Sequence, residues 1–482
     1  MKTCLGALPA LLTRIMLALF IALMACTLYL GAFQNGETQK AFGLGLLALA
    51  AMVLVLPLLS RLLARLGPLW AWVILTLLCL AVKGAWILLV RVPQAYDYAT
   101  FWSYAQQLAQ QDTLAYGRYM ALFPHVFGYS SFLSWFIRLF GEGELVAQWV
   151  NVVLTAISGS FLFLIGKRWW GLAGGISVYL LWIACPSQTM YNVFALSEPL
   201  YTTLLLAVLT LIAWAEEGKK LPVVVGLAAG VLLRLFQGVR PIAAVVLIAL
   251  VIWRFCLKPE ELGRREGRRY WLPLVGLTLA AYLVTGPLWN AHLAARIGEE
   301  PATSSGYSFL VGFNYNYSGQ WNQGDSDLLF SFSNEPGATA QQAQEKAMEA
   351  AKERITSGQI NFPALMKEKM KNLMGTDDAC VNYSRAVLRH HEAFSLLCNT
   401  FYYAVLLLGA AGAVVLWRRN DRSAMLLLPL YILGLTCAQM LVEVAGRYHY
   451  SILPALLLLA QPVLMSPALD WRKILRKKRE SP

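Results

Sequence analysis

The chain has 482 residues, of which 58% are hydrophobic and only 14% are charged. A soluble domain has about 25% charged residues, so this composition excludes an ordinary soluble protein and indicates a polytopic membrane protein. The formal net charge of +13 does not predict a nucleic-acid partner, because the lysines and arginines fall in short clusters between apolar runs.

Apolar runs long enough to cross a bilayer core recur about twelve times. We predict spans at residues 9–32, 41–60, 69–90, 145–166, 171–187, 199–215, 221–237, 241–257, 271–289, 399–417, 423–443 and 449–466. The first run has no convincing small-residue cleavage site, so we expect no cleavable signal peptide. The fold class is therefore an all-α integral membrane protein with two long connections, 91–144 and 290–398.

Lysine and arginine gather in every second connection. The basic connections are residues 60–67, 166–170, 216–220, 254–270, 417–423 and the C-terminal tail. The positive-inside rule then places both termini in the cytoplasm and both long connections outside, in a multi-pass protein of the plasma membrane. Three regions follow: 1–289 with nine spans and the outer loop 91–144, the large outer loop 290–398, and 399–482 with three spans and a basic cytoplasmic tail.

The loop 91–144 is too long and too aromatic for a simple connector. It begins RVPQAYDYATFWSYAQQLAQQ and carries Asp97, Asp112, Arg118 and His125 among many rings. Tryptophan and tyrosine collect at membrane interfaces, so we expect a structured surface there, with a helix over 98–111. Asp97 follows the end of a span by a few residues, which places its carboxylate where lipid headgroups lie.

The late loop, 290–398, contains parts of different amino-acid composition. Residues 301–338 are rich in Gly, Ser, Asn and Tyr and predict an irregular surface suited to carbohydrate, whereas 338–359 are strong helix formers. Residues 362–375 are amphipathic and predict a helix lying on the outer membrane interface. A structural cap over the spans is the alternative role for this loop.

Neither the cysteines nor the histidines predict a metal site. The eight cysteines contain no CxxC pair and no zinc spacing, and the five histidines are scattered. Cys380 and Cys398 lie in or beside the late loop, and a disulfide between them is left open, as is any requirement for a divalent metal.

A transporter is a second class to consider. Many secondary transporters have two related halves and ionisable groups deep in their spans. This chain shows no clear repeat, and Lys83, Arg234 and Glu443 all lie nearer the outer ends of their spans, where snorkelling also accounts for them.

Several segments, in order, carry a resemblance to a known family. They are YDYATFWSYAQQLA, FPHVFGYSSFLSWFIRLFGEGELVAQWV, ALSEPLYTTLLLAVL, GLAAGVLLRLFQGVRPIAAVVLIAL, GYSFLVGFNYNYSGQWNQGD and GRYHYSILPALLLLA. Together they resemble GT-C-fold glycosyltransferases that use polyprenyl-phosphate sugars, including the protein O-mannosyltransferase-like group. The resemblance covers most of the chain from about residue 68. The chain departs from it in two extra leading spans and in a single Asp97 where many relatives have two adjacent acids.

The chemistry of such a transfer explains the residues of interest. Phosphate is a good leaving group, so the reaction mainly needs a base for the acceptor hydroxyl, and a positioned carboxylate contributes ~10²–10⁴-fold. Arginine is suited to the departing phosphate because it binds phosphate through two parallel bonds. We therefore expect catalysis by Asp97 with inversion at the anomeric carbon. The expected donor-phosphate contacts are Arg240, Arg447 and Arg118, and the expected substrate contacts are His125, Glu198, Tyr448 and Asp325.

Each of these residues also has a structural alternative. Asp97 is a favoured N-cap residue, Arg240 precedes Pro241 at a span end, and Glu443 and Arg447 have the spacing of a helical ion pair. The remaining alternatives are solvated-surface roles for Arg118 and His125, helix-start stabilisation by Glu198, and a turn role for Asp325.

The sequence thus predicts an inverting membrane glycosyltransferase whose active site faces the extracytoplasmic side. Its partners are membrane lipid, a lipid-linked sugar donor and a glycan, lipid or protein acceptor; apart from that donor substrate, no cofactor is assigned. A transporter or flippase of a lipid-linked saccharide is the first alternative, and an assembly factor of a cell-envelope complex is the second. The sugar, the acceptor and the oligomeric state are left open.

Overall fold

The computed structural model describes residues 2–218 and 221–466, and in this part every regular element is helical. The α-helices are α1 (Lys2–Ala32), α2 (Gly36–Leu63), α3 (Pro68–Leu89), α4 (Tyr96–Gln110), α5 (Arg118–Leu122), α6 (Pro124–Phe140), α7 (Glu144–Ala184), α8 (Pro186–Tyr191), α9 (Glu198–Gly218), α10 (Pro222–Val239), α11 (Ala243–Val251), α12 (Arg265–Ile297), α13 (Gly306–Gly312), α14 (Gln323–Ser333), α15 (Ala340–Thr356), α16 (Phe362–Met374), α17 (Ala379–Asn382), α18 (His391–Arg418), α19 (Leu427–Leu441), α20 (Ile452–Leu459) and α21 (Gln461–Leu464). The predicted cytoplasmic tail, 467–482, lies outside the described residues.

Nine helices of the described chain are long and apolar enough to cross a membrane. They are Ala7–Ala32, Gly36–Leu66, Pro68–Leu89, Glu144–Ala184, Glu198–Glu216, Pro222–Val239, Arg265–Ile297, His391–Arg418 and Ala424–Leu441. The all-helical, multi-pass membrane class is therefore confirmed. The predicted number of about twelve differs from this count, and the difference arises at three places.

The first place is α7, which is counted once but turns back on itself. Trp170 and Gly171 have non-helical backbone angles, and Gly171 has φ 72°, which glycine adopts without strain. Gly159 packs against the ring of Tyr179, and Gly175 packs against the backbone of Phe163, so the two arms of α7 lie antiparallel. The predicted spans 145–166 and 171–187 are these two arms.

The other two places are short or interrupted helices. The helix over Ala243–Leu257 is shorter than a span and ends in a π-helical turn, Ile252–Leu257. The predicted span 449–466 is broken into a 3₁₀ turn (η6, Gly446–His449), α20 and α21. Every residue from Ile452 to Ala460 is buried, so hydropathy alone made a protein-buried segment resemble a lipid-facing one.

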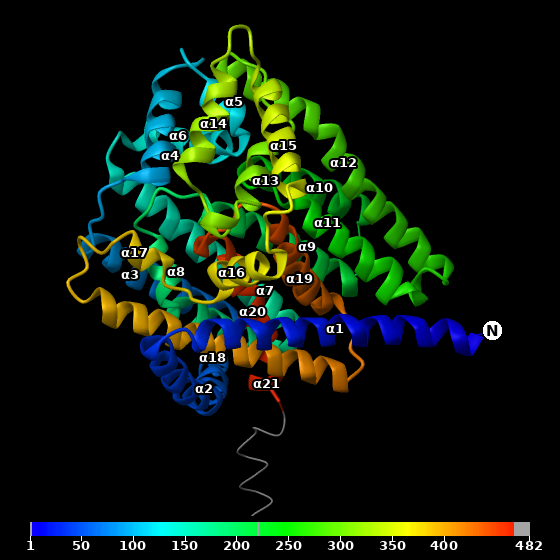
Figure 1. Cartoon of the computed structure of the whole chain (residues 1–482). Coiled ribbons are helices and arrows are strands. Elements are labelled where there is room, and N and C mark those ends of the chain that lie inside the picture. The colour runs from blue at the N-terminus through cyan, green and yellow to red at the C-terminus, as the bar shows by residue number, and fades with distance from the viewer. Residues whose placement is uncertain (1, 219–220, 467–482) are drawn as a thin grey trace, which may run out of the picture.

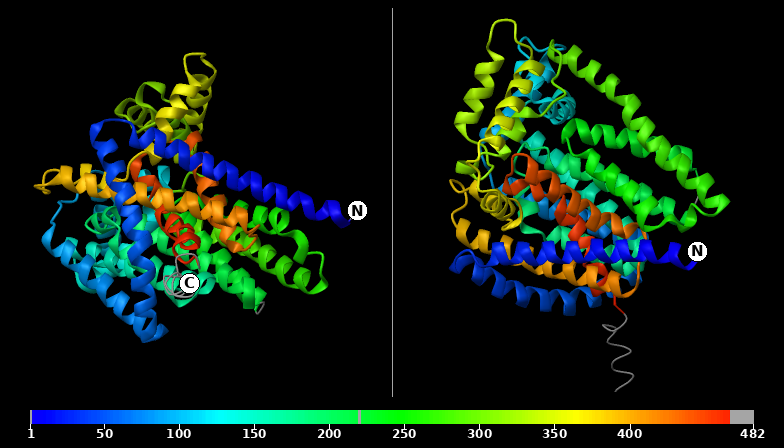
Figure 2. Two further views of the ribbon diagram at one scale, coloured as in Figure 1. Left: turned by 90° about the horizontal axis from the view of Figure 1, so that it is seen from below. Right: turned by 45° about the vertical axis from the view of Figure 1, so that its right-hand side comes forward.

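The spans pack as a bundle around α7 and α18. Helix α7 contacts α3, α9 and α20, while α18 contacts α1, α2 and α20. Helix α10 lies between α9 and α12. In Figure 2, α1 and α18 run side by side, and in Figure 1 the N-terminal end of α1 lies far from α4, α14 and α15.

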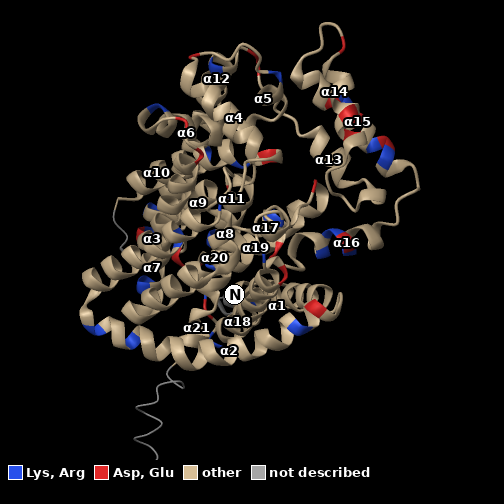
Figure 3. Cartoon of the chain, turned by 90° about the vertical axis from the view of Figure 1, so that its left-hand side faces the viewer, with Lys and Arg blue, Asp and Glu red and all other residues tan. Residues whose placement is uncertain are grey.

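The two predicted outer loops form one helical layer at one end of the bundle. The amides of Leu114 and Ala302 donate to Arg296 O and Ala121 O, at 2.9 and 2.8 Å, and so join the early loop to the late one. Figure 3 shows charged residues gathered on α14, α15 and α16, whereas the long helices carry few. This layer, which we call the outer layer after its predicted orientation, covers the ends of the later spans on that side of the bundle.

Local predictions in this layer are confirmed for three helices and wrong for one stretch. Helices α4, α15 and α16 occupy the predicted ranges 98–111, 338–359 and 362–375 to within a few residues. Residues 301–338, predicted to be irregular, contain α13 and α14, because Asn322 caps α14 and tertiary packing buries Leu310 and Leu329.

Lys83 shows how this bundle accommodates a cation inside a span. Its ammonium group is fully buried and donates to Ile183 O at 2.8 Å, to Cys185 O at 3.4 Å and to the hydroxyl of Thr189. The last carbonyls of a helix lack intrahelical partners, so Lys83 completes the end of α7. Its role here is structural, and the ammonium group is enclosed by protein, without the solvent access that snorkelling provides.

Candidate active site

Residues from four distant parts of the chain meet beside the outer helical layer. Asp97 lies in the first turn of α4, Glu198 begins α9, Arg240 follows α10, and Arg447 and Tyr448 lie in η6. In each case a helix end places the polar group there, because helix ends lie at the boundary between the spans and the outer layer. These five residues were all predicted to belong to the site.

Arg447 bridges two carboxylates. Its Nη2 donates to Asp97 Oδ2 in a charge-assisted hydrogen bond, and its Nε lies 3.5 Å from Glu198 Oε1. A guanidinium group can bind two acids at once because its donors form a planar fork. Asp97 does not cap α4: Ala95 is the N-cap residue and no side chain caps the helix.

The two carboxylates differ in their access to solvent. The side chain of Asp97 is 51% exposed, whereas that of Glu198 is 1% exposed. Burial alone raises the pKa of Asp97, but Arg447, with a smaller effect of Arg240, outweighs burial and lowers the pKa below its usual value. Asp97 is therefore an ionised and accessible carboxylate, while Glu198 is enclosed with its Oε2 lacking a hydrogen-bond partner.

A second cation lies beside this pair. The guanidinium carbon of Arg240 is 4.0 Å from the ring centroid of Tyr448 and 5.9 Å from that of Tyr201, in cation–π geometry. The Tyr448 hydroxyl donates to Glu443 Oε1 at 2.9 Å. Among the described residues, no carboxylate forms a salt bridge with Arg240, so its charge is available to an anionic ligand.

His125 is uncharged at neutral pH. Burial, together with the positive charges of Arg240 and Arg447, lowers the pKa of His125 to about 3, against the opposite effect of Asp97. A neutral imidazole has one donor and one acceptor nitrogen. His125 is therefore suited to hydrogen bonding with a hydroxylated ligand, and it is a weak base.

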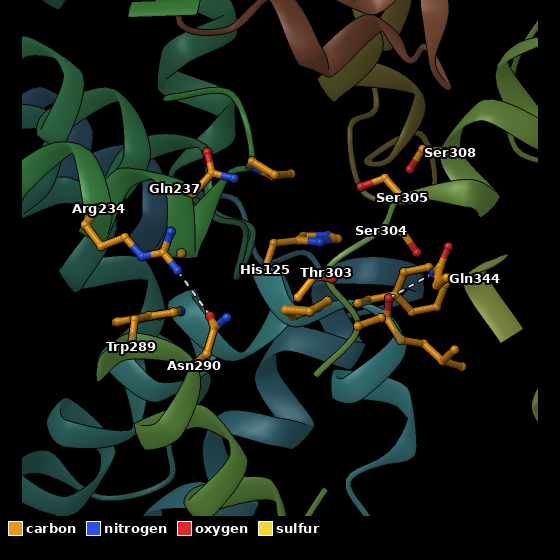
Figure 4. Close-up of a pocket in the computed structure, with 16 residues that line it drawn as sticks. His125, Arg234, Gln237, Trp289, Asn290, Thr303, Ser304, Ser305, Ser308 and Gln344 are labelled. Atoms are coloured by element: carbon orange, nitrogen blue, oxygen red, sulfur yellow. Dashed lines mark hydrogen bonds between the residues drawn. The ribbon is translucent and has the colours of Figure 1, made fainter. Parts of the chain in front are cut away.

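A polar cavity of about 330 Å³ opens next to His125. It is bounded by the early loop at 122–125, by the outer ends of α10 and α12, and by the late loop at 302–308. In Figure 4, His125 lies between Arg234 and Asn290 on one side and a row of serines on the other. His125 lines this cavity, whereas Asp97 is not among its lining residues.

Two predicted residues have partners elsewhere. Arg118 Nε forms a 2.6 Å salt bridge with Glu299, and its Nη1 donates to Ser333 O and Ala338 O. Asp325 is nearly buried and accepts two bonds from Arg354, at 2.7 and 2.9 Å. Both residues hold the outer layer together, and the structure does not bring either into the Asp97 cluster.

The sequence missed two members of the cluster. The expected helical ion pair between Glu443 and Arg447 does not form, because α19 ends at Leu441 and Glu443 instead accepts a bond from Tyr448. Burial raises the pKa of Glu443. Burial also raises the pKa of Tyr119, and the charge of Asp97 adds to this effect. Tyr119 is one of several tyrosines in the early loop, and nothing in the sequence distinguishes it from the others.

Within the described residues, no group of three or more His, Cys, Asp or Glu side chains is arranged to hold a metal ion. Cys380 and Cys398 are buried and free; their side chains contact each other through a hydrogen bond.

Comparisons with known proteins give a structural likeness. No family model matches the chain, and no curated protein matches it significantly. Among solved structures, the chain is similar to ArnT from Cupriavidus metallidurans, in a crystal structure bound to undecaprenyl phosphate. The identity is 14%, the match covers 79% of this chain and 77% of that chain, and the TM-score is 0.36. A TM-score this low does not establish a common fold, so the site is interpreted from its own geometry.

Proposed function

We propose that this chain is an inverting membrane glycosyltransferase of the GT-C type, the type expected from the sequence resemblance. It transfers a sugar from a polyprenyl-phosphate donor to a hydroxyl on the extracytoplasmic side of the plasma membrane. The observation that carries the proposal is the exposed carboxylate of Asp97, bound to Arg447 and close to Arg240 at the outer ends of the spans.

Asp97 is the general base in this proposal. The acceptor oxygen attacks the anomeric carbon while its proton passes to Asp97, and the bond from that carbon to the phosphate oxygen breaks with its electrons leaving on phosphate. Single displacement inverts the anomeric centre. The exposure of Asp97 supports this role, because of the two acids on Arg447 only Asp97 is open to a substrate.

Arg447 and Arg240 stabilise the leaving phosphate. Phosphate competes with Asp97 for the guanidinium group of Arg447, since both are oxyanions that it binds in the same way. As the phosphate takes over Arg447, Asp97 loses the charge that holds its pKa low, and it becomes a stronger base. Donor binding and activation of the base are thereby coupled.

The remaining residues of the cluster position these groups. Glu198 holds Arg447 from its buried side, and Tyr448 stacks on Arg240. His125 hydrogen-bonds the acceptor from the adjoining cavity. Arg118 and Asp325 have no role in this scheme, because their partners lie elsewhere in the outer layer.

The test is transfer by purified protein in nanodiscs, with synthetic polyprenyl-phosphate sugars, a panel of lipid, glycan and peptide acceptors, and mass spectrometry of the products. We expect Asp97→Asn to bind the donor and to transfer at least ~10²-fold more slowly, because an amide cannot take the proton. Asp112→Asn is the matched control, an acid of the same loop whose side chain is fully exposed, and should transfer normally.

Near-normal transfer by a well-folded Asp97→Asn protein would remove Asp97 as the base. Movement of a lipid-linked saccharide across vesicles without any transfer would instead favour a flippase.

A further inference from the structure

The segment that carries Arg447 and Tyr448 has little regular structure of its own. Helix α19 ends at Leu441 and α20 begins at Ile452, and between them η6 is a single 3₁₀ turn. So short a turn is not fixed by its own backbone bonds, and side-chain contacts must decide where its arginine points. His449, the last residue of η6, makes such contacts.

Both ring nitrogens of His449 have partners in the late loop. The side chain is 1% exposed; its Nδ1 lies 2.6 Å from Leu373 O and its Nε2 lies 3.0 Å from Asp377 Oδ1. The ring also stacks on that of Tyr402, with 5.3 Å between centroids. None of these partners is Asp97, so an effect of His449 on the chemistry has to pass through η6.

Asp377 connects this segment to the one that leads to Glu198. It is 2% exposed; its Oδ1 faces His449, and its Oδ2 accepts a 2.5 Å hydrogen bond from Ser187 Oγ. Ser187 belongs to α8, which lies beside α17 (Figure 1). The backbone amide of Asp377 donates to Asn399 Oδ1 of α18 at 2.8 Å. One buried carboxylate therefore bonds to two of the segments that supply the cluster.

Close packing joins the same segments at further points. Gln188 Nε2 donates to the Tyr450 hydroxyl at 3.3 Å, and the rings of Tyr191 and Tyr450 meet edge to face at 5.1 Å. On the other side of η6, a Cβ atom added to Gly446 would lie 3.1 Å from Ala379 Cβ. Because packing this close leaves no room for independent movement, the position of η6 depends on that of the late loop.

The chemistry of the pair determines how its protons are placed. A carbonyl oxygen only accepts, so Nδ1 of His449 carries a hydrogen and donates it to Leu373 O. Nε2 and Asp377 then share one proton, and the pair has no net charge wherever that proton lies. Burial raises the pKa of Asp377, although His449 and Ser187 act in the opposite direction. A pair without net charge is the form that such a buried site tolerates.

We propose that His449 and Asp377 are positioning residues of the transferase, which hold η6 in the place where Arg447 meets Asp97 and Glu198. This inference rests on the proposed function, because it names the residues that support the arginine assigned there to the donor phosphate. Without the pair, η6 shifts, and Arg447 is displaced from the donor phosphate and from both acids.

The first test removes the hydrogen bonds and keeps the ring. His449→Phe retains the packing on Tyr402 and leaves Leu373 O and Asp377 without their partner. In the transfer assay, we expect the KM for the polyprenyl-phosphate sugar to rise about 10–100-fold, the range for lost bonds to charged groups. A merely structural loss would reduce the amount of active protein and leave the KM unchanged. His390→Phe, at an exposed histidine of the same loop, is the matched control and should keep the wild-type KM.

Two amide variants separate the parts of the pair. In Asp377→Asn, the amide nitrogen can donate to Nε2 of His449 while the amide oxygen accepts from Ser187, so this variant should keep the wild-type KM. In His449→Asn, the amide nitrogen can replace Nδ1 and bond Leu373 O, but nothing reaches Asp377. His449→Asn should therefore raise the KM for the donor, and it provides the test if His449→Phe does not fold.

Hydrogen exchange of the full-length protein in nanodiscs, read by mass spectrometry, tests the pair without catalysis. We expect His449→Phe and His449→Asn to exchange faster than the wild type at 443–451 and at 186–197, and at the wild-type rate in α4 and α10. Asp377→Asn should exchange at the wild-type rate throughout.

Wild-type exchange at 443–451 in a folded His449→Asn protein, or a wild-type KM for the donor in that protein, would overturn the inference. Asp377→Asn as impaired as His449→Phe would also overturn it, because the pair would then need an ionised acid. If no acceptor is glycosylated, faster exchange at 443–451 in the His449 variants would support the pair and contradict the proposed function alone.

Discussion

At the residue scale, the central feature is one guanidinium group shared by an exposed and a buried carboxylate. Hydropathy and charge bias predicted the depth and the side of the membrane for Asp97, Glu198 and Arg447, but not their pairing. The reason is that Asp97 and Arg447 are 350 residues apart, and nothing local links them. The local pairing that spacing did suggest, Glu443 with Arg447, requires a helix that ends before it.

His125 makes the stability of the protein depend on pH. Its pKa is about 3 in the folded state and about 6.5 in the unfolded chain, so the unfolded state binds more protons between these values. Stability from this group is complete above pH 6.5 and is lost as the pH falls toward 3. We expect the melting temperature of the wild type to fall more steeply than that of His125→Gln between pH 6.5 and pH 4.5.

The difference between the wild type and His125→Gln isolates the contribution of His125 to the pH dependence of stability. Glu443 and Asp377 have pKa values raised by burial and titrate in both proteins, so their effects cancel. The pKa of Asp97 is lowered, so this carboxyl group stays ionised between pH 6.5 and pH 4.5. Parallel melting curves, measured by intrinsic fluorescence, would show that His125 is not buried in its neutral form.

At the scale of elements, the segment that carries Arg447 is held by the outer layer. Glu443 N donates to Ser308 O, and Val444 N donates to Gly319 O, both at 2.9 Å. Lys369 of α16 is buried and donates to the carbonyls of Gly312, Met440 and Val442 at 2.7–2.9 Å. The late loop therefore positions the segment that carries Arg447, in addition to covering the spans.

Replacing Lys369 with Met keeps the length of the side chain and leaves three carbonyls without their donor. We expect a loss of ~2–4 kcal/mol of stability, because bonds from a charged group contribute ~1.5–3 kcal/mol each and water replaces only some of them. The KM for the donor should rise as Arg447 loses its support. Thermal unfolding and transfer kinetics measure both effects.

Lys367→Met is the control, since Lys367 is exposed on the same helix. A Lys369→Met protein as stable as this control would mean that Lys369 does not hold the segment.

Some helices of this region could be predicted from the sequence, whereas the break beside Arg447 could not. Helices α15 and α16 were predictable because their propensity and amphipathic pattern are local properties. The break from η6 into α20 was not, because its residues are apolar and only burial against α7, α18 and α19 distinguishes them from a lipid-facing span. The buried position of Lys369 was likewise hidden within a regular lysine pattern.

At the scale of the whole molecule, the charge bias of the connections sets the orientation. In Figure 1 the N-terminal end of α1 and the start of α12 lie away from the layer that holds Asp97. If the positive-inside rule governs this chain, that layer is extracytoplasmic.

Single-cysteine labelling on a cysteine-free background tests this orientation. A membrane-impermeant maleimide should label Tyr116→Cys in intact cells, because the Tyr116 side chain is 71% exposed in the outer layer. Arg419→Cys, at the exposed end of α18, should react only after the membrane is permeabilised. The reverse pattern would place Asp97 in the cytoplasm and contradict an extracytoplasmic transferase.

The bond between Asp97 and Arg447 also has a consequence for biosynthesis. The ribosome makes Asp97 350 residues before its counter-charge, an interval of about 20–70 s at ~5–20 residues per second. Throughout that interval Asp97 lacks Arg447, and Glu198 lacks it from the moment that Glu198 is itself synthesised. A nascent chain, or one truncated before Arg447, therefore holds an incomplete cluster, and the proposed chemistry becomes possible only after Arg447 has been synthesised.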